Sequence, residues 1–126
     1  MTEFYPLYTS TISGNFEEVK ILMSVLSNQV YEYDRCHNTR VKDTILCYAA
    51  YEGHIDIVKY IINMGADPHT RFSYPLVYTA RNGFIDIVKY LVDIGVDPTD
   101  GDNKAIVYAL ENGKYDVVKY LKSITT

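Results

Sequence analysis

The chain has 126 residues, of which 48% are hydrophobic and 22% charged, so one domain with a continuous core is expected and disorder is not. Its net charge of −4 argues against a surface for nucleic acid or for an anionic membrane, and neither partner is expected. Two cysteines, Cys36 and Cys47, are too few for a disulfide framework and fit the cytoplasm or another reducing intracellular compartment.

The first segment in chain order, about residues 5–28, is expected to form a pair of short helices. Its Tyr5-Pro6-Leu7 sequence precedes Gly14 by the interval that separates Tyr74-Pro75-Leu76 from Gly83. A proline at the first helical position loses no hydrogen bond, and its fixed φ suits the start of a helix. The residues before it lack a basic region followed by a long apolar one, so no secretory signal is expected.

A polar connection over about residues 29–42 follows this first segment. The interval from Gly14 to Gly53 is longer than the interval from Gly53 to Gly83, which recurs later in the chain. Insertions in repeat arrays fall in loops, often on the binding face. We therefore expect an extended finger or a short extra turn here.

A short sequence that begins with glycine then occurs three times at a constant spacing, since Gly53, Gly83 and Gly113 are evenly separated. Such a period is the mark of stacked supersecondary units, and glycine suits the left-handed residue that ends a helix. The copies are Gly53–Tyr60, Gly83–Tyr90 and Gly113–Tyr120, with a fainter one at Gly14–Lys20. We expect a single domain over residues 1–126, with units at about residues 5–28, 43–67, 73–97 and 103–124.

Each copy is expected to open the second helix of its unit. Apolar residues such as Ile55, Val58 and Ile61 recur on one helical face. The acid in the fourth slot, as at Asp56, lies in the first turn, where the helix dipole favours negative charge. A lysine three residues later, as at Lys59, can form an exposed pair worth roughly a few tenths of a kcal/mol. A Gly-Ala-Asp-Pro or Gly-Val-Asp-Pro sequence then ends the helix. No apolar run is long enough to span a membrane.

This succession of helix, glycine turn, helix and Gly-Ala-Asp turn resembles the ankyrin repeat. Tyr74–Ala80 and Thr44–Ala50 are similar to the family's Thr-Pro-Leu-His-Leu-Ala-Ala. Gly53–Ile62 is similar to its Gly-His-Leu-Glu-Ile-Val-Lys-Leu-Leu-Leu, and Gly65–Asp67 to its Gly-Ala-Asp turn. The resemblance covers nearly the whole chain. It implies an all-α ankyrin-repeat solenoid of about four helix-turn-helix units with short fingers.

The chain departs from the usual ankyrin pattern in two ways. The family's period is about 33 residues, whereas this one is shorter, as the step from Gly53 to Gly83 shows. The histidine of the family's first helix is replaced, so its hydrogen bonds are not expected; the residues in that slot are Tyr8, Cys47, Val77 and Val107. The shortened period with Val-Val-Lys-Tyr-Leu at residues 117–121 resembles the ankyrin variant of mimivirus-like giant viruses. That resemblance implies a viral protein that meets its partner in the host cell cytoplasm.

Thirteen tyrosines and no tryptophan are the unusual feature of the composition. Evenly spaced aromatic residues can stack nucleic-acid bases. However, these slots hold leucine in the ankyrin sequences that the chain resembles, and a half-buried tyrosine with a solvated hydroxyl needs no ligand. We interpret both sets that follow the repeat period as packing residues; they are Tyr48, Tyr78 and Tyr108, and Tyr60, Tyr90 and Tyr120.

Metal binding and catalysis find little support in the sequence. Cys36, His37, Cys47 and His54 are of zinc-binding types, but their spacing matches no paired zinc motif. The fourth-slot acids are spread one per unit and so are not a paired acid and base. No phosphate loop, nucleophile elbow or His-Glu-x-x-His sequence is present. We expect no enzyme, no metal and no cofactor. A small metal-binding or cysteine-dependent protein that uses the Cys36 to His54 region stays open as an alternative.

The surface that remains consists of the fingers and the exposed ends of the first helices. The ankyrin resemblance implies that these positions bind a partner protein, and aromatic and arginine residues are enriched in binding hot spots. The chain is expected to be a monomeric, non-catalytic interaction module that binds through its concave face and fingers; a self-assembling structural component is a further alternative. The candidate binding residues are Tyr51, Glu52, Arg71, Phe72, Tyr74, Arg81, Asn82, Asp102, Asn103, Glu111 and Asn112.

Overall fold

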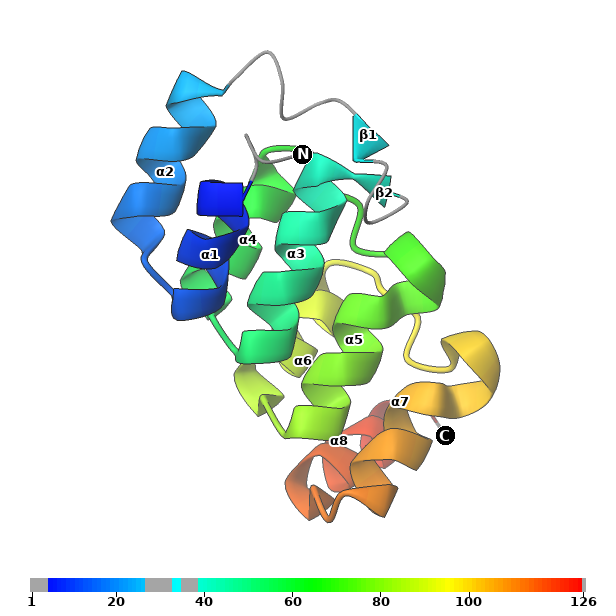
Figure 1. Cartoon of the computed structure of the whole chain (residues 1–126). Helices are drawn as coiled ribbons and strands as arrows, with labels where there is room; N and C mark the ends of the chain where they lie inside the picture. The colour runs from blue at the N-terminus through cyan, green and yellow to red at the C-terminus, as the bar shows by residue number, and fades with distance from the viewer. Residues whose placement is uncertain (1–4, 27–32, 35–38, 126) are drawn as a thin grey trace. The chain divides into compact units, whose positions relative to one another are not determined.

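A computed structural model describes residues 5–26, 33–34 and 39–125, with only the backbone of residues 33, 34 and 39. This part of the chain forms eight helices and one pair of two-residue strands (Figure 1). None of these helices is long and apolar enough to cross a membrane. They are α1 (Tyr5–Ser13), α2 (Phe16–Val25), α3 (Val41–Glu52), α4 (Ile55–Asn63), α5 (Thr70–Asn82), α6 (Ile85–Asp93), α7 (Asp100–Glu111) and α8 (Tyr115–Thr125). The strands are β1 (Tyr33–Asp34) and β2 (Thr39–Arg40).

The chain divides into two compact units, Met1–Asp67 and Pro68–Thr126. Within the first unit, α1 packs on α2 and α3, and α3 packs on α4. Within the second unit, α5 packs on α6 and on α7, and α7 packs on α8. Each unit therefore holds two helix pairs, and the first helices of its two pairs lie side by side (Figure 1). This arrangement confirms the predicted all-α repeat fold.

Glycine ends the first helix of these pairs, as the repeat predicted. Gly53 caps α3 with φ 83° and Gly83 caps α5 with φ 82°, a left-handed conformation that residues with a Cβ rarely adopt. At Gly83 a side chain would also meet the stem of Lys114, whose Cδ would lie 2.8 Å from the added Cβ. The left-handed turn therefore favours glycine here, whereas the lysine stem could move aside for a larger residue.

The apolar slots of the repeated sequence form the core of each unit. In the first unit Ile57 and Ile61 of α4 are fully buried. In the second unit the equivalent residues of α6 and α8 are also buried; they are Ile87, Leu91, Val117 and Leu121. Burying one such side chain contributes about 1.5–3 kcal/mol to folding. The apolar residues of the repeated sequence therefore stabilise the fold.

The acid in the fourth slot has the same geometry in three pairs. Its Oδ1 accepts a hydrogen bond from the N–H of the following residue. This bond adds to the favourable interaction of the carboxylate with the helix dipole. The distances are 2.8 Å for Asp56 to Ile57, 2.9 Å for Asp86 to Ile87 and 2.9 Å for Asp116 to Val117. Glu17 and Lys20 form the predicted exposed ion pair at 2.9 Å. Lys89 lies over the ring of Tyr120, 5.4 Å from its centroid.

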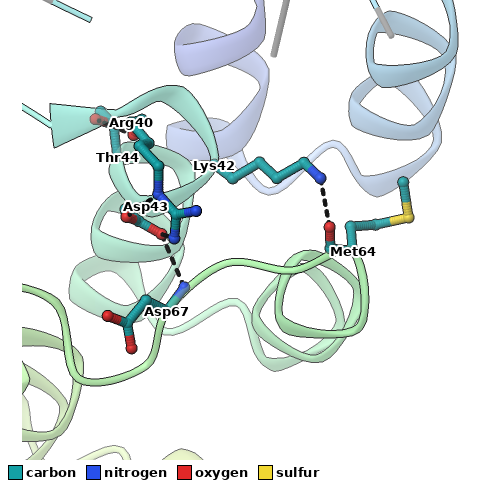
Figure 2. A network of polar contacts seen from close by, with 6 residues as sticks. All are labelled: Arg40, Lys42, Asp43, Thr44, Met64 and Asp67. Atoms are coloured by element: carbon teal, nitrogen blue, oxygen red, sulfur yellow. Dashed lines mark hydrogen bonds and ion pairs between the residues drawn. The ribbon is translucent and has the colours of Figure 1, made fainter. Parts of the chain in front are cut away.

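A partly buried polar network holds the start of α3 (Figure 2). Lys42 is 4% exposed, and its Nζ donates to the carbonyl of Met64. Asp43 is 5% exposed; its Oδ1 accepts the N–H of Asp67 at 2.8 Å, and its Oδ2 accepts Nε of Arg40 at 3.0 Å. Burying a charge without such partners would cost several kcal/mol. The network therefore accounts for two charged residues in the interior of the first unit.

The connection before α3 includes the antiparallel pair of β1 and β2. Tyr33 lies opposite Arg40, and Asp34 lies opposite Thr39. α3 already begins at Val41, so the last two residues of the expected connection are helical. The polar network described above explains this early start, because it fixes both Lys42 and Asp43 in the first turn of the helix.

Candidate functional site

The element called α5 begins with a left-handed turn. Arg71, Phe72 and Ser73 have φ of 53°, 57° and 62°, although none of them is glycine. The left-handed conformation costs an L-residue about 1–2 kcal/mol. The N–H of Ser73 donates to the carbonyl of His69 at 3.1 Å, and its buried hydroxyl donates to Oδ2 of Asp100 at 2.7 Å. These two bonds offset part of the strain and fix the turn.

The element called α7 begins in the same way. Gly101, Asp102 and Asn103 have φ of 63°, 60° and 64°, and the N–H of Asn103 donates to the carbonyl of Thr99 at 3.0 Å. The sequence predicted only a turn or short finger at these two places, about residues 69–74 and 99–104. Both fingers of the second unit share this left-handed conformation, which their residue types did not predict.

An aromatic cluster follows the first of these turns. The rings of Tyr74 and Tyr78 stack with centroids 4.2 Å apart, and Tyr78 meets Tyr108 edge to face at 6.2 Å. The guanidinium carbon of Arg81 lies 5.7 Å from the Tyr78 centroid, within the range of a cation–π interaction. Each aromatic pair contributes about 0.5–1.5 kcal/mol beyond its buried area, so these ring contacts stabilise one another.

The left-handed turn and the aromatic cluster together line a solvent-open cavity of about 180 Å³. It lies within the second unit, where α5 and α7 are neighbours (Figure 1). Phe72 is 78% exposed, so most of its ring is open to a ligand. Both charged residues of the lining are cations. The lining residues are Arg71, Phe72, Tyr74, Val77, Tyr78, Lys104 and Tyr108.

Four of the predicted binding residues come together at this cavity. Arg71, Phe72 and Tyr74 line it, and Arg81 packs over the ring of its neighbour Tyr78. These four come from one finger and the helix that follows it. The aromatic and arginine residues that were predicted in the second unit therefore lie at or next to one cavity.

The other seven predicted residues do not line the cavity. In the second unit, Asn82 ends α5, Asp102 and Asn103 lie in the left-handed turn of α7, and two residues lie at the end of that helix. These two are Glu111 and Asn112, and the side chain of Asn112 donates to the carbonyl of Tyr108 at 2.8 Å. In the first unit, Tyr51 and Glu52 are exposed at the end of α3.

Four lining residues were absent from the predicted set: Val77, Tyr78, Lys104 and Tyr108. Tyr78 and Tyr108 are half-buried, which agrees with a packing role, but they also form the cavity wall. The sequence does contain a signal. Tyr78 follows Tyr74 by one helical turn, and Lys104 and Tyr108 occupy these two slots again one repeat later. Combining helical spacing with the repeat period would have placed these side chains next to one another.

The zinc-type residues named from the sequence are placed only in part. Cys47 is half-buried in the middle of α3, and Nε2 of His54 lies 2.9 Å from the carbonyl oxygen of Ile12. Cys36 and His37 lie outside the described residues. Among the residues that are described, no group of three or more histidine, cysteine or acidic side chains could hold a metal ion.

Three ionisable groups with displaced pKa values lie outside the cavity. Burial raises the pKa of Tyr120. The hydrogen bond to Asp43 raises the pKa of Arg40. The hydrogen bond from the Thr99 N–H lowers the pKa of Asp97, and the hydrogen bond from the Thr99 hydroxyl lowers it further. Each displacement has a local structural cause, and none indicates a pair of catalytic groups.

Paired helices that recur at a constant period, with glycine turns between them, define a helical-repeat protein. A family model for ankyrin repeats, in three copies, matches residues 2–72 and 65–125. The chain belongs to the ankyrin-repeat family. Members of this family generally act as protein–protein interaction modules and are typically not enzymes. A comparison with curated proteins finds no match.

Proposed function

We propose that this protein is a non-catalytic interaction module that binds a partner protein at the finger and aromatic cluster of α5. The observation that carries the proposal is the cavity lined by Arg71, Phe72 and Tyr74 in a protein of the ankyrin family. Aromatic and arginine side chains in such a setting are the commonest hot spots of protein interfaces. A partner side chain that enters the cavity would lose most of its contact with water.

Contacts within the second unit connect the finger to its neighbours, which also supports binding at this place. The bond from Ser73 to Asp100 and the stacked rings of Tyr74 and Tyr78 hold the cavity wall before any partner arrives. A surface that is already ordered loses little conformational entropy on binding, which raises affinity. The left-handed turn at Phe72 also keeps an apolar ring 78% exposed, where a partner can cover it.

The other predicted residues extend this site in the proposal. Asp102 and Asn103 continue along the second finger, and the end of α7 adds two exposed polar residues, Glu111 and Asn112. Asn82 ends α5. In the first unit, Tyr51 and Glu52 occupy the equivalent end of α3, and we propose them as a binding surface of that unit by itself. We expect these residues to contribute less than about 1 kcal/mol each, as rim residues do.

The test is affinity purification with three forms of the protein, followed by binding measurements with the purified partner. Phe72→Ala/Arg81→Ala should weaken binding by tenfold or more. Tyr115→Ala is the matched control, because Tyr115 is an aromatic residue of the same unit that is 69% exposed and lies outside the cavity. Equal affinity of the double variant and the wild type would contradict the proposed site.

We further propose that the protein is a monomer, so its molecular mass in solution should not change with concentration. A mass that rises with concentration would favour a self-assembling component instead.

We also propose, from the resemblance to the giant-virus ankyrin variant, that the partner is met in the host cell cytoplasm. The support for this last point is the shortened repeat period and the sequence of residues 117–121 alone.

A further inference from the structure

The size of the cavity limits what can fill it. Pockets that bind small molecules usually measure about 300–1,000 Å³, and a water molecule occupies about 30 Å³. At about 180 Å³ the cavity is smaller than such pockets, and it is open to solvent on one side. A single amino-acid side chain can fill it.

The walls favour a side chain with an apolar stem. Tyr74, Tyr78 and Tyr108 supply aromatic faces and edges, Val77 is 5% exposed beneath them, and Phe72 stands open at the rim. Methylene groups packed against such rings lose contact with water without losing a hydrogen bond.

The charge of the lining residues indicates which chemical group should stand at the end of that side chain. The charged residues around the cavity are Arg71 and Lys104, both cationic, in a protein of net charge −4. The carboxylate of Asp100 in the second finger accepts the Ser73 hydroxyl at 2.7 Å and the Gly101 N–H at 3.0 Å, and it does not line the cavity. The lining residues are therefore positively charged although the whole protein carries −4, and a positive lining complements an anion.

Lys104 lines the cavity from the second finger. Its stem passes beside Gly101, since a Cβ built on that glycine would lie 3.4 Å from Cδ of Lys104. Within the described residues no carboxylate lies within ion-pair distance of its ammonium group. The ammonium is thus positioned at the cavity and available for a charge-assisted hydrogen bond.

From these observations we infer that the cavity receives a glutamate side chain from an acidic segment of the partner protein. The glutamate methylenes pack on the tyrosine rings, and its carboxylate accepts a hydrogen bond from Lys104, while Arg71 adds a second positive charge to the lining. This inference rests on the proposed function, since it names the chemistry of the partner at the same site. Glutamate has one methylene more than aspartate and therefore more apolar surface to pack on the rings.

The experiment selects peptides from a random peptide library displayed on phage against the intact protein. The best peptide is then labelled with fluorescein, and its affinity is measured by fluorescence polarisation. The same measurement uses the peptide with its glutamate changed to glutamine, the protein variant Lys104→Gln, and both together. Lys122→Gln is the control, because it removes the same charge from an exposed site outside the cavity.

The expected result is a set of enriched peptides that share a glutamate. Lys104→Gln and the glutamine peptide should each weaken binding by about threefold to tenfold, and the two together little more than either alone. The loss should shrink at high salt, and Lys122→Gln should bind as the wild type does.

Two other results would overturn the inference, and they are distinguishable. Enriched peptides without a shared acid, or equal affinity for Lys104→Gln and wild type, would overturn the glutamate inference and leave the interaction module standing. A failure to enrich any peptide that depends on Phe72 would overturn the proposed site as well.

Discussion

The hydroxyl of Ser73 donates a hydrogen bond to the carboxylate of Asp100 at 2.7 Å. Ser73 is the last left-handed residue of the turn that opens α5, and Asp100 is the first residue of α7. The other oxygen of the same carboxylate accepts the N–H of Gly101 at 3.0 Å. One side chain therefore links the two fingers of the second unit, and through them it positions Phe72 and Lys104 at the cavity.

Removing this link should destabilise the protein. Ser73→Ala deletes a buried hydroxyl that donates to a charged acceptor, and we expect a loss of about 1–2 kcal/mol in the free energy of unfolding. Urea denaturation measures it. Ser123→Ala is the control, since that exposed hydroxyl donates only to the Tyr120 carbonyl within its own helix, and its effect should stay within about 0.5 kcal/mol. Equal effects of the two changes would show that the link contributes nothing.

The left-handed conformation of Phe72 predicts an unusual order of stability. Phe72→Ala keeps a Cβ at φ 57°, whereas Phe72→Gly adopts this conformation without the steric penalty. The glycine variant should therefore be more stable than the alanine variant by about 1 kcal/mol, although glycine usually destabilises a helix. Thermal and urea unfolding of the two variants test this. If alanine proved the more stable, the turn would not be left-handed in solution.

The polar network of α3 predicts a graded loss of stability in the first unit. Asp43→Ala leaves the N–H of Asp67 without its acceptor and removes the partner of Arg40, which should cost about 1–3 kcal/mol. Asp43→Asn keeps an oxygen for that N–H and should cost less. Urea unfolding distinguishes the two, with Glu111→Ala as an exposed control. A larger loss for asparagine than for alanine would contradict the role given to the N–H bond.

The Asp97 carboxylate predicts a pH effect. Its Oδ1 accepts the N–H of Thr99 at 2.9 Å and the Thr99 hydroxyl at 2.7 Å, and these bonds lower its pKa in the folded state. Because the folded pKa lies below the unfolded one, the stabilisation is present above the unfolded pKa and is lost as the pH falls through the folded pKa.

Thr99→Val should raise the pKa of Asp97 toward its ordinary value, but not fully, because the N–H remains. A carboxyl-carbon NMR titration measures the shift. Thr99→Ser keeps the hydroxyl and should leave the pKa low. An unchanged pKa in the valine variant would mean that the hydroxyl does not bind the carboxylate in solution.

Much of the fold could be predicted because its signals are local. A glycine that ends a helix, an acid that starts the next one and an apolar stripe between them all lie within one turn or two of each other, as in Gly53 to Ile61. Repetition of the same signals at a constant period then indicates which helices are neighbours. For the same reason Arg71, Phe72 and Tyr74 could be named as candidate binding residues from their place in the repeat.

The conformation of the fingers and the assembly of the cavity depended on residues far apart in the chain. The left-handed turn at Phe72 contains no glycine, and the bond that holds it joins Ser73 to a residue 27 positions later. Tyr78 and Lys104 line one cavity because α5 packs on α7, not because of any pattern in either segment alone. The sequence by itself therefore determined the repeat and its family, through local periodicity. Only the tertiary structure decided the shape and positive charge of the site, since both arise where two helices meet.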